Sequence, residues 1–317
     1  GVYYNLDESL PKDLPSVIAN TKLKEDYNMN TTHMILVDSS VAGSDVKKMS
    51  QEIEKVDGVK WVLGLDNLVG SGVPADMLPE SVTGMLKNDK YQLLMVNSTY
   101  KVATDKVNKQ IEQIDKIMDK YDKGAMLVGE GPLTKDLINI TDTDFKRVSA
   151  VSIGIVFVII LLLFKSVTIP VILVGVIEFA IFVNMGIPFY TGTKLPFVAS
   201  IVIGTIQLGA TVDYAILMTT RYQRERSRGA GKFDAITTAH KFSAQSIIVS
   251  ALSFFAATIG VGLYSNIDMI SSLCILMARG ALISMVVVVL ILPSLFMVFD
   301  KIIVKTSKGF RPTGLKS

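Results

Sequence analysis

The sequence contains few of the residues from which metal centres, disulfide frameworks and catalytic dyads are built. It has one cysteine, Cys274, and two histidines, so no disulfide can form within the chain. No histidine, cysteine and carboxylate spacing is typical of a metal site, and the residues around Gly129-Glu-Gly131 do not have the Lys and Ser/Thr spacing of a phosphate-binding loop. No nucleophile–base set can be recognised either. These absences argue against an enzyme and predict neither a metal site nor an organic cofactor.

An excess of charge is also missing. The formal net charge is +3, which is too small to imply a nucleic-acid partner. The apolar residues are instead distributed unevenly along the chain, because residues 1–146 are rich in Lys, Asp, Glu and Asn, whereas residues 147–300 are mostly apolar. We therefore expect a polar lead-in over 1–30, a folded domain over 31–146, a membrane bundle over 147–300 and a basic tail over 301–317.

The polar half alternates short apolar runs with amphipathic helices. One helix is expected to begin at Ser44 or Asp45 and to run through Val56, and a second to begin at Thr104 or Asp105 and to run through Tyr121. After a turn, a third is expected over Leu133–Phe145. A short helix is possible after Pro79. Strands are expected over Thr32–Val37, Val59–Leu65, Tyr91–Thr99 and Ala125–Val128. The order βαββαβ predicts a ferredoxin-like α+β domain without chemistry of its own, in which His33 is a strand residue.

Five apolar segments follow, each long enough to cross a bilayer, which needs about 20 residues. They are Val148–Phe164, Val167–Pro188, Pro196–Thr220, Ala244–Leu263 and Ile270–Phe299. The fifth is long for one span, so Ile267–Met277 could be an interfacial lead-in. Residues 232–242 place Phe233, Ile236, Ala239 and Phe242 on one side, which predicts an amphipathic helix on the membrane surface. His240 on that helix is expected to be solvated.

Lysine and arginine predict the orientation, because they are enriched in cytoplasmic loops. The loops 189–195 and 264–269 on one face contain only Lys194. The other face contains Lys165, Arg221, Arg224, Arg226, Arg228, Lys232, Lys241, Lys301, Lys305, Lys308, Arg311 and Lys316. We therefore expect a multi-pass protein of the cell membrane with residues 31–146 outside, the C-terminus inside and a further span upstream of residue 1.

One acid stands out within the third apolar segment. Asp213 is the only ionisable acid between Pro196 and Thr220, and a carboxylate at such a depth is unfavourable by about 2.5–3.5 kcal/mol on insertion scales. An intramembrane acid is therefore a functional hypothesis, the alternative being an acid that snorkels to the headgroups. Tyr214 adds a phenol that can donate or accept a proton.

Other polar residues in the apolar half are secondary candidates. Glu178 could serve as a second proton site, or it could be a protonated acid bonded to a neighbouring helix. Gln207 and Asn184 are suited to hydrogen bonds between helices. Arg279 is expected to pair with an acid or with lipid headgroups.

Three motifs in the membrane half resemble one half of an RND-superfamily transporter of the MMPL family. They are Gly209-Ala-Thr-Val-Asp213-Tyr214, Arg221-Tyr222-Gln-Arg-Glu225-Arg, and Arg279-Gly280-Ala-Leu-Ile-Ser284 before Leu292-Pro293. Members of that family use proton influx to export lipids, amphiphiles or drugs. The resemblance implies that Asp213 carries the proton and that Tyr214 is its partner. It also implies a second half or another protomer as partner, and favours the C-terminal half of a longer protein that lacks the first span here.

Two other functions remain open within the same superfamily. A membrane receptor that binds lipids without transporting them would be similar to the sterol-sensing relatives. A protein-secretion accessory is the third possibility, although those relatives carry Asp-Ala-Asn where this chain has Asp213-Tyr214-Ala215.

Overall fold

A computed structural model describes residues 2–4, 9–68 and 80–310 of the chain. Parts of the predicted lead-in, of the loop after Leu65 and of the basic tail lie outside these residues. The chain divides into two compact units, one over Tyr4–Asp142 and the other over Gly1–Tyr3 with Thr143–Ser317. Each unit is described by itself.

The first unit contains a four-stranded sheet. Its elements are α1 (Pro15–Asp26), β2 (Thr31–Asp38), α2 (Gly43–Ile53), β3 (Val59–Leu63), α3 (Leu65–Leu68), α4 (Glu80–Leu86), β4 (Tyr91–Ser98), α5 (Asp105–Tyr121) and β5 (Met126–Gly129). The strand order is β3-β4-β2-β5, and all three pairings are antiparallel. From β2 to β5, the strands and the helices α2 and α5 follow one another in the order βαββαβ that the sequence predicted, and the short helices α3 and α4 lie between β3 and β4.

Alternation along the strands builds the core of this unit. Ile35 and Val37 of β2 are fully buried, and Leu36 between them points to the opposite face of the sheet. Helices α2 and α5 cover the buried face with apolar stripes that include Met49 of α2 and Ile114 of α5. The α5 helix begins where the Thr104 side chain accepts a hydrogen bond from the Val107 backbone N–H, as an N-cap does.

The polar lead-in contains a helix that the sequence analysis did not predict, α1, which has 12 residues. Pro15 stands at its beginning, where the missing N–H of proline has no partner to lose and its fixed φ suits the helix. Proline in this stretch therefore marks a helix start rather than the absence of regular structure.

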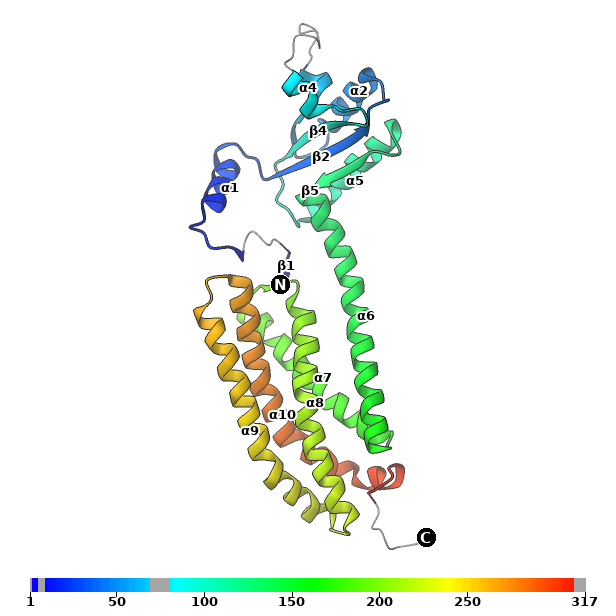
Figure 1. The fold of residues 1–317 in the computed structure, drawn as a ribbon, viewed down its shortest axis with the longest axis vertical. Coiled ribbons are helices and arrows are strands. Elements are labelled where there is room, and N and C mark those ends of the chain that lie inside the picture. Colours follow the sequence, from blue (N-terminus) through cyan, green and yellow to red (C-terminus); the bar gives the residue numbers. More distant parts are fainter. Residues whose placement is uncertain (1, 5–8, 69–79, 311–317) are drawn as a thin grey trace. The chain divides into compact units, whose positions relative to one another are not determined.

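The second unit is a bundle of long helices (Figure 1). They are α6 (Glu130–Phe164), which belongs to this unit from Thr143 onward, α7 (Thr168–Thr191), α8 (Ala199–Ser227), α9 (Lys232–Tyr264) and α10 (Asp268–Thr306). Within the described residues, five helices are long and apolar enough to cross a membrane. Two short strands, β1 (Val2–Tyr3) and β6 (Leu195–Pro196), pair in parallel at one end of the bundle.

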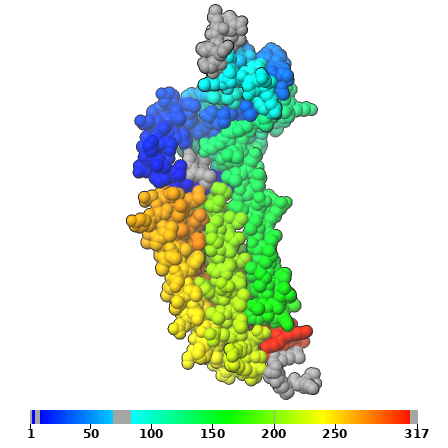
Figure 2. Space-filling view, in the orientation of Figure 1, coloured from blue at the N-terminus to red at the C-terminus, as the bar shows by residue number. Residues whose placement is uncertain are grey.

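Helix α10 packs against α7, α8 and α9. Helices α8 and α9 lie side by side, and their side chains form one continuous surface in the space-filling view (Figure 2). Buried residues of all five helices share one core, which includes Phe164, Leu173, Met218, Ile247 and Val288. The bundle thus has an interior of its own, although its outer surface is rich in exposed apolar side chains.

Two predicted helix boundaries are wrong because hydropathy changes where helicity does not. The predicted helix Leu133–Phe145 and the span beginning at Val148 are parts of one helix, α6. Likewise, the predicted surface helix 232–242 is continuous with the following span in α9. No Gly or Pro interrupts either junction, so charged residues there change the environment of the helix and not its backbone.

The surface helix also differs from its predicted orientation. Ile236 and Ala239 are buried in the bundle core, whereas Phe233 and Phe242 are exposed. Only part of the predicted apolar side therefore faces the bundle core, and the rest is exposed. Helix α10 similarly includes the expected lead-in 267–277 almost entirely and continues to Thr306, into the predicted tail.

Candidate functional site

Asp213 and Tyr214 occupy consecutive positions on α8 but point in different directions. The Asp213 side chain is exposed, while Tyr214 is 8% exposed and contributes to the bundle core. Successive side chains leave a helix about 100° apart, which explains the difference. The Asp213 carboxylate makes no hydrogen bond or ion pair with any described residue. It is therefore available to groups outside this chain.

A small cavity adjoins Tyr214. Its volume is about 10 Å³, close to the smallest space that holds one water molecule. Polar side chains of Gln207, Thr211, Tyr214 and Ser284 contribute to its walls.

A chain of hydrogen bonds begins at Arg279 of α10 and passes to Asn184 of α7. The Arg279 Nε donates to Asn184 Oδ1 at 2.8 Å, and its Nη2 donates to the Asn184 carbonyl oxygen at 2.9 Å. Asn184 Nδ2 in turn donates to Gln207 Oε1 at 2.9 Å and to the Leu276 carbonyl oxygen at 3.1 Å. Among the described residues, Arg279 therefore bonds to an amide and a carbonyl rather than to an acid, and the alternative of lipid headgroups stays a prediction.

Gln207 of α8 continues the chain of hydrogen bonds. Its Nε2 donates to Ser284 Oγ at 3.0 Å, and the Thr211 hydroxyl lies 2.8 Å from the same oxygen. The sequence prediction that Asn184 and Gln207 join helices is thus confirmed. Gly280 makes the contact possible, since a Cβ there would lie 2.7 Å from Asn184 Nδ2 and 2.8 Å from Gln207 Oε1. The network links three helices and ends at the cavity beside Tyr214.

Glu178 of α7 takes no part in this network. Its side chain is half-buried, and it forms no hydrogen bond or ion pair with the described part of the chain. Among the described residues, Glu178 therefore has no hydrogen bond to a neighbouring helix.

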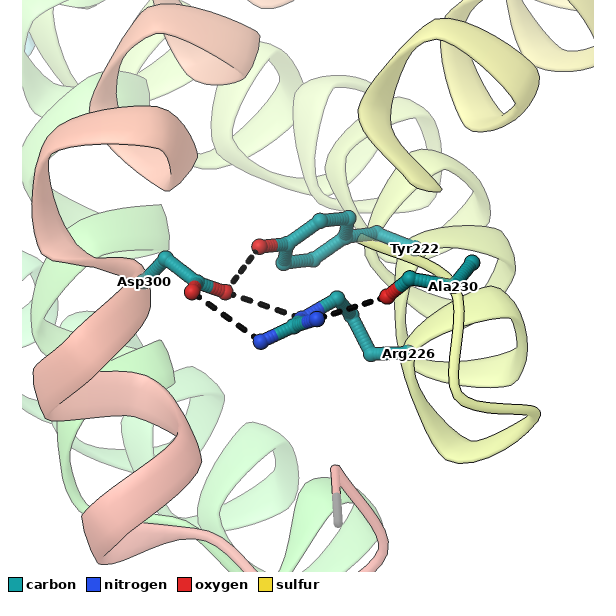
Figure 3. A network of polar contacts seen from close by, with 4 residues as sticks. All are labelled: Tyr222, Arg226, Ala230 and Asp300. Atoms are coloured by element: carbon teal, nitrogen blue, oxygen red, sulfur yellow. Dashed lines mark hydrogen bonds and ion pairs between the residues drawn. The ribbon is translucent and has the colours of Figure 1, made fainter. Parts of the chain in front are cut away.

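A second polar cluster, which sequence reasoning missed, joins the ends of α8 and α10 (Figure 3). Arg226 Nε donates to Asp300 Oδ1 and Arg226 Nη2 donates to Asp300 Oδ2, both at 3.0 Å. Arg226 Nη1 donates to the Ala230 carbonyl oxygen at 2.6 Å. The Tyr222 hydroxyl donates to Asp300 Oδ1 at 2.5 Å, and its ring stacks on Phe296 with centroids 5.0 Å apart. Bidentate geometry of this kind is among the stronger forms of ion pair.

The cluster is also well shielded. The side chains of Arg226 and Asp300 are 18% and 8% exposed. The sequence analysis includes Arg226 among the basic residues that set the orientation and in the second family motif, but it assigns Arg226 no acid partner. The residue that could have indicated this cluster is Asp300, an acid that directly follows the fifth apolar segment. The arginines that follow the third apolar segment are expected at the same end of the bundle.

The bundle of long apolar helices and the separate sheet unit define a multi-span membrane protein with an α/β domain. The chain matches the model of the MMPL family over residues 9–312. It therefore belongs to the MMPL family, as its motifs predicted.

Relatives agree with this assignment. The chain is 24% identical to the putative membrane protein YdgH of Bacillus subtilis over 79% of its own length and 28% of that protein. It is 23% identical to the probable transport protein MmpL1 of Mycobacterium tuberculosis over 80% of its own length and 27% of that protein. The chain thus spans less than a third of these relatives.

A solved structure shows a related fold. The match to the crystal structure of a heavy metal efflux pump covers 86% of this chain and 35% of the pump chain. The TM-score is 0.51 and the sequence identity is 12%. At this identity the similarity concerns the fold alone.

Proposed function

We propose that the chain is one half of an RND-type transporter that exports lipids, amphiphiles or drugs across the cytoplasmic membrane, driven by proton influx. The observation that carries the proposal is the position of Asp213. Its carboxylate is exposed on a membrane-spanning helix and has no partner among the described residues. Family membership supports the assignment to transport.

The proposed partner of Asp213 is a second half, supplied by the remainder of a longer protein or by another protomer. A charged carboxylate facing only lipid would be unfavourable by about 2.5–3.5 kcal/mol, so a complementary surface is expected to cover it. Protonation would remove the charge and could bias the two halves between two packings. One proton crossing 100 mV contributes about 2.3 kcal/mol to such a change.

We assign Tyr214 a supporting role in proton transfer. Its phenol can both donate and accept a proton, and it adjoins the water-sized cavity at the end of the Arg279–Ser284 network. Gln207 and Arg279 would act by holding α7, α8 and α10 in register. Protons are the only coupling species that the proposal requires.

We further propose that the basic end of the bundle is cytoplasmic and that the βαββαβ unit is a ferredoxin-like extracytoplasmic domain. The concentration of lysine and arginine at one end supports the orientation. Five spans would place the α/β unit and the C-terminus on opposite sides of the membrane.

The test is substrate flux along an imposed pH gradient, measured for the full-length transporter at matched expression. Asp213→Asn keeps the shape and removes the titration, so it should abolish proton-driven flux while leaving membrane insertion unchanged. Tyr214→Phe should reduce flux by about fivefold, equivalent to one hydrogen bond of ~1 kcal/mol. Glu178→Gln is the matched control on α7 and should transport normally.

Three results would contradict the proposal. Normal flux in Asp213→Asn would indicate a snorkelling acid, and loss of flux in Glu178→Gln alone would place the proton site on α7. A wild-type protein that binds lipid but moves none along the gradient would favour the lipid receptor.

A further inference from the structure

A groove of about 450 Å³ runs between α7 and α10 on the surface of the helical unit. Its volume lies within the range of about 300–1,000 Å³ that is typical of ligand sites. The lining is apolar apart from Thr168 and includes Val171, Gly175 and Phe179 of α7 and Leu295, Phe299 and Ile302 of α10. From Thr168 to Phe179 the groove follows α7 for roughly 16 Å.

Gly175 keeps the groove open. A Cβ at this position would have no atom within 4 Å, so the space beside it is unfilled by the described residues. Both helices are apolar enough to span a membrane, and the groove therefore opens toward hydrocarbon. An apolar chain fits this lining better than any hydrated molecule.

One end of the groove is basic. The Thr168 hydroxyl lies 2.7 Å from the Thr306 hydroxyl, and the Lys308 backbone N–H donates to the Lys165 carbonyl oxygen at 3.3 Å. These contacts bring Lys165 and Lys305 to the same end, since Lys305 follows Ile302 by about one turn of α10. Both side chains are exposed, and neither forms an ion pair or hydrogen bond with a described residue.

We propose that this groove binds an anionic phospholipid, with one acyl chain between α7 and α10 and the phosphate against Lys165 and Lys305. An apolar channel that ends at two unpaired ammonium groups matches a molecule with a hydrocarbon chain and an anionic head. Basic pockets between membrane helices bind anionic headgroups in this way. Lipid binding in this groove requires neither Asp213 nor a particular orientation of the basic end.

Tryptophan fluorescence tests the site directly. Phe179→Trp places a fluorescent reporter in the groove. Phe182→Trp is the control, because Phe182 is 72% exposed and does not line the groove. Both are made in a Trp61→Phe background, which removes the native tryptophan. The protein is reconstituted in phosphatidylcholine vesicles that contain increasing brominated phosphatidylglycerol or brominated phosphatidylcholine. The groove reporter should show about a fivefold preference for phosphatidylglycerol, the factor equivalent to ~1 kcal/mol, and the control should show none.

Two sets of variants test the lysines that bind the headgroup and the groove that binds the acyl chain. Lys165→Gln with Lys305→Gln should abolish the preference, whereas Lys194→Gln at the opposite end of the bundle should leave it unchanged. Gly175→Leu should fill the groove and reduce quenching by both lipids, whereas Gly186→Leu, on the same helix outside the lining, should not. Equal quenching by the two lipids at the groove reporter would overturn the proposal. So would a preference that survives loss of both lysines, or a groove that neither lipid enters because polypeptide covers it.

Discussion

His33 lies buried on β2 with only part of its hydrogen-bonding capacity used. Its Nε2 lies 3.3 Å from Gln110 Oε1, while Nδ1 has no partner among the described residues. Burial lowers the pKa of the imidazole, and the hydrogen bond to Gln110 opposes this only in part. The imidazole is therefore neutral in the folded unit near pH 7. The prediction of a strand residue is confirmed.

The lowered pKa of His33 predicts a pH-dependent stability. The unfolded chain binds a proton near its ordinary pKa of about 6.5, whereas the folded unit binds it only at lower pH. The contribution of neutral His33 to the free energy of unfolding should therefore be fully present above about pH 6.5. It should be lost as the pH decreases toward the pKa of the folded state. Urea unfolding of a fragment over residues 31–146, followed by circular dichroism, measures this, and His33→Gln should remove the histidine contribution.

The fragment is expected to be soluble with a mixed α/β spectrum, because its helices and strands share one core. The same pH dependence in His33→Gln would show that other groups titrate. Asp38, which is exposed, and Glu52, which is half-buried, have lowered pKa values, caused chiefly by hydrogen bonds with Ser40 and Lys120 respectively. Both carboxyl groups titrate below the pH range of His33.

At the scale of elements, the ends of α8 and α10 are joined by a shielded ion pair. Arg226→Ala would leave the Asp300 carboxylate without its bidentate partner, with only the Tyr222 hydroxyl remaining. Removal of one partner of a buried pair typically destabilises by about 3–5 kcal/mol. We expect a loss of that order in the free energy of unfolding, measured by denaturant unfolding in detergent micelles.

Arg228 provides the matched control for this prediction. It pairs with Glu225 within the same segment, but its side chain is 57% exposed. Arg228→Ala should change stability by less than ~0.5 kcal/mol. A double replacement, Arg226→Leu with Asp300→Leu, should recover most of the loss, because it removes both charges together. Equal effects of the two alanine variants would contradict this account.

At the scale of the whole molecule, the distribution of charge predicts a topology. Ser227 lies at the end of α8 among arginines, and Lys106 lies in α5 of the α/β unit. In a Cys274→Ala background, cysteine at Ser227 should react with an impermeant thiol reagent only from the cytoplasm, and cysteine at Lys106 only from outside. Intact cells and inverted vesicles give the two measurements, and the opposite pattern would reverse the orientation.

The spans and strands could be predicted from the sequence because they rest on local physics. A membrane helix requires a long apolar run, and Pro196–Thr220 and Ala244–Leu263 have one. A half-buried strand requires alternation, and Thr32–Val37 has it. Helix ends were less predictable, since α6 and α9 continue through charged stretches that hydropathy treats as boundaries. The acid at Asp213 was recognised by composition alone.

Only the tertiary structure decided which way these residues point and what they touch. The bond between Arg279 and Asn184 joins positions 95 residues apart, and that between Arg226 and Asp300 joins positions 74 apart. The rotation of α8, which exposes Asp213 and buries Tyr214, follows from its packing against α7, α9 and α10. A local sequence specifies that a segment is helical, because helical hydrogen bonds close within four residues. The face that becomes buried depends on distant segments, whose side chains must fit together.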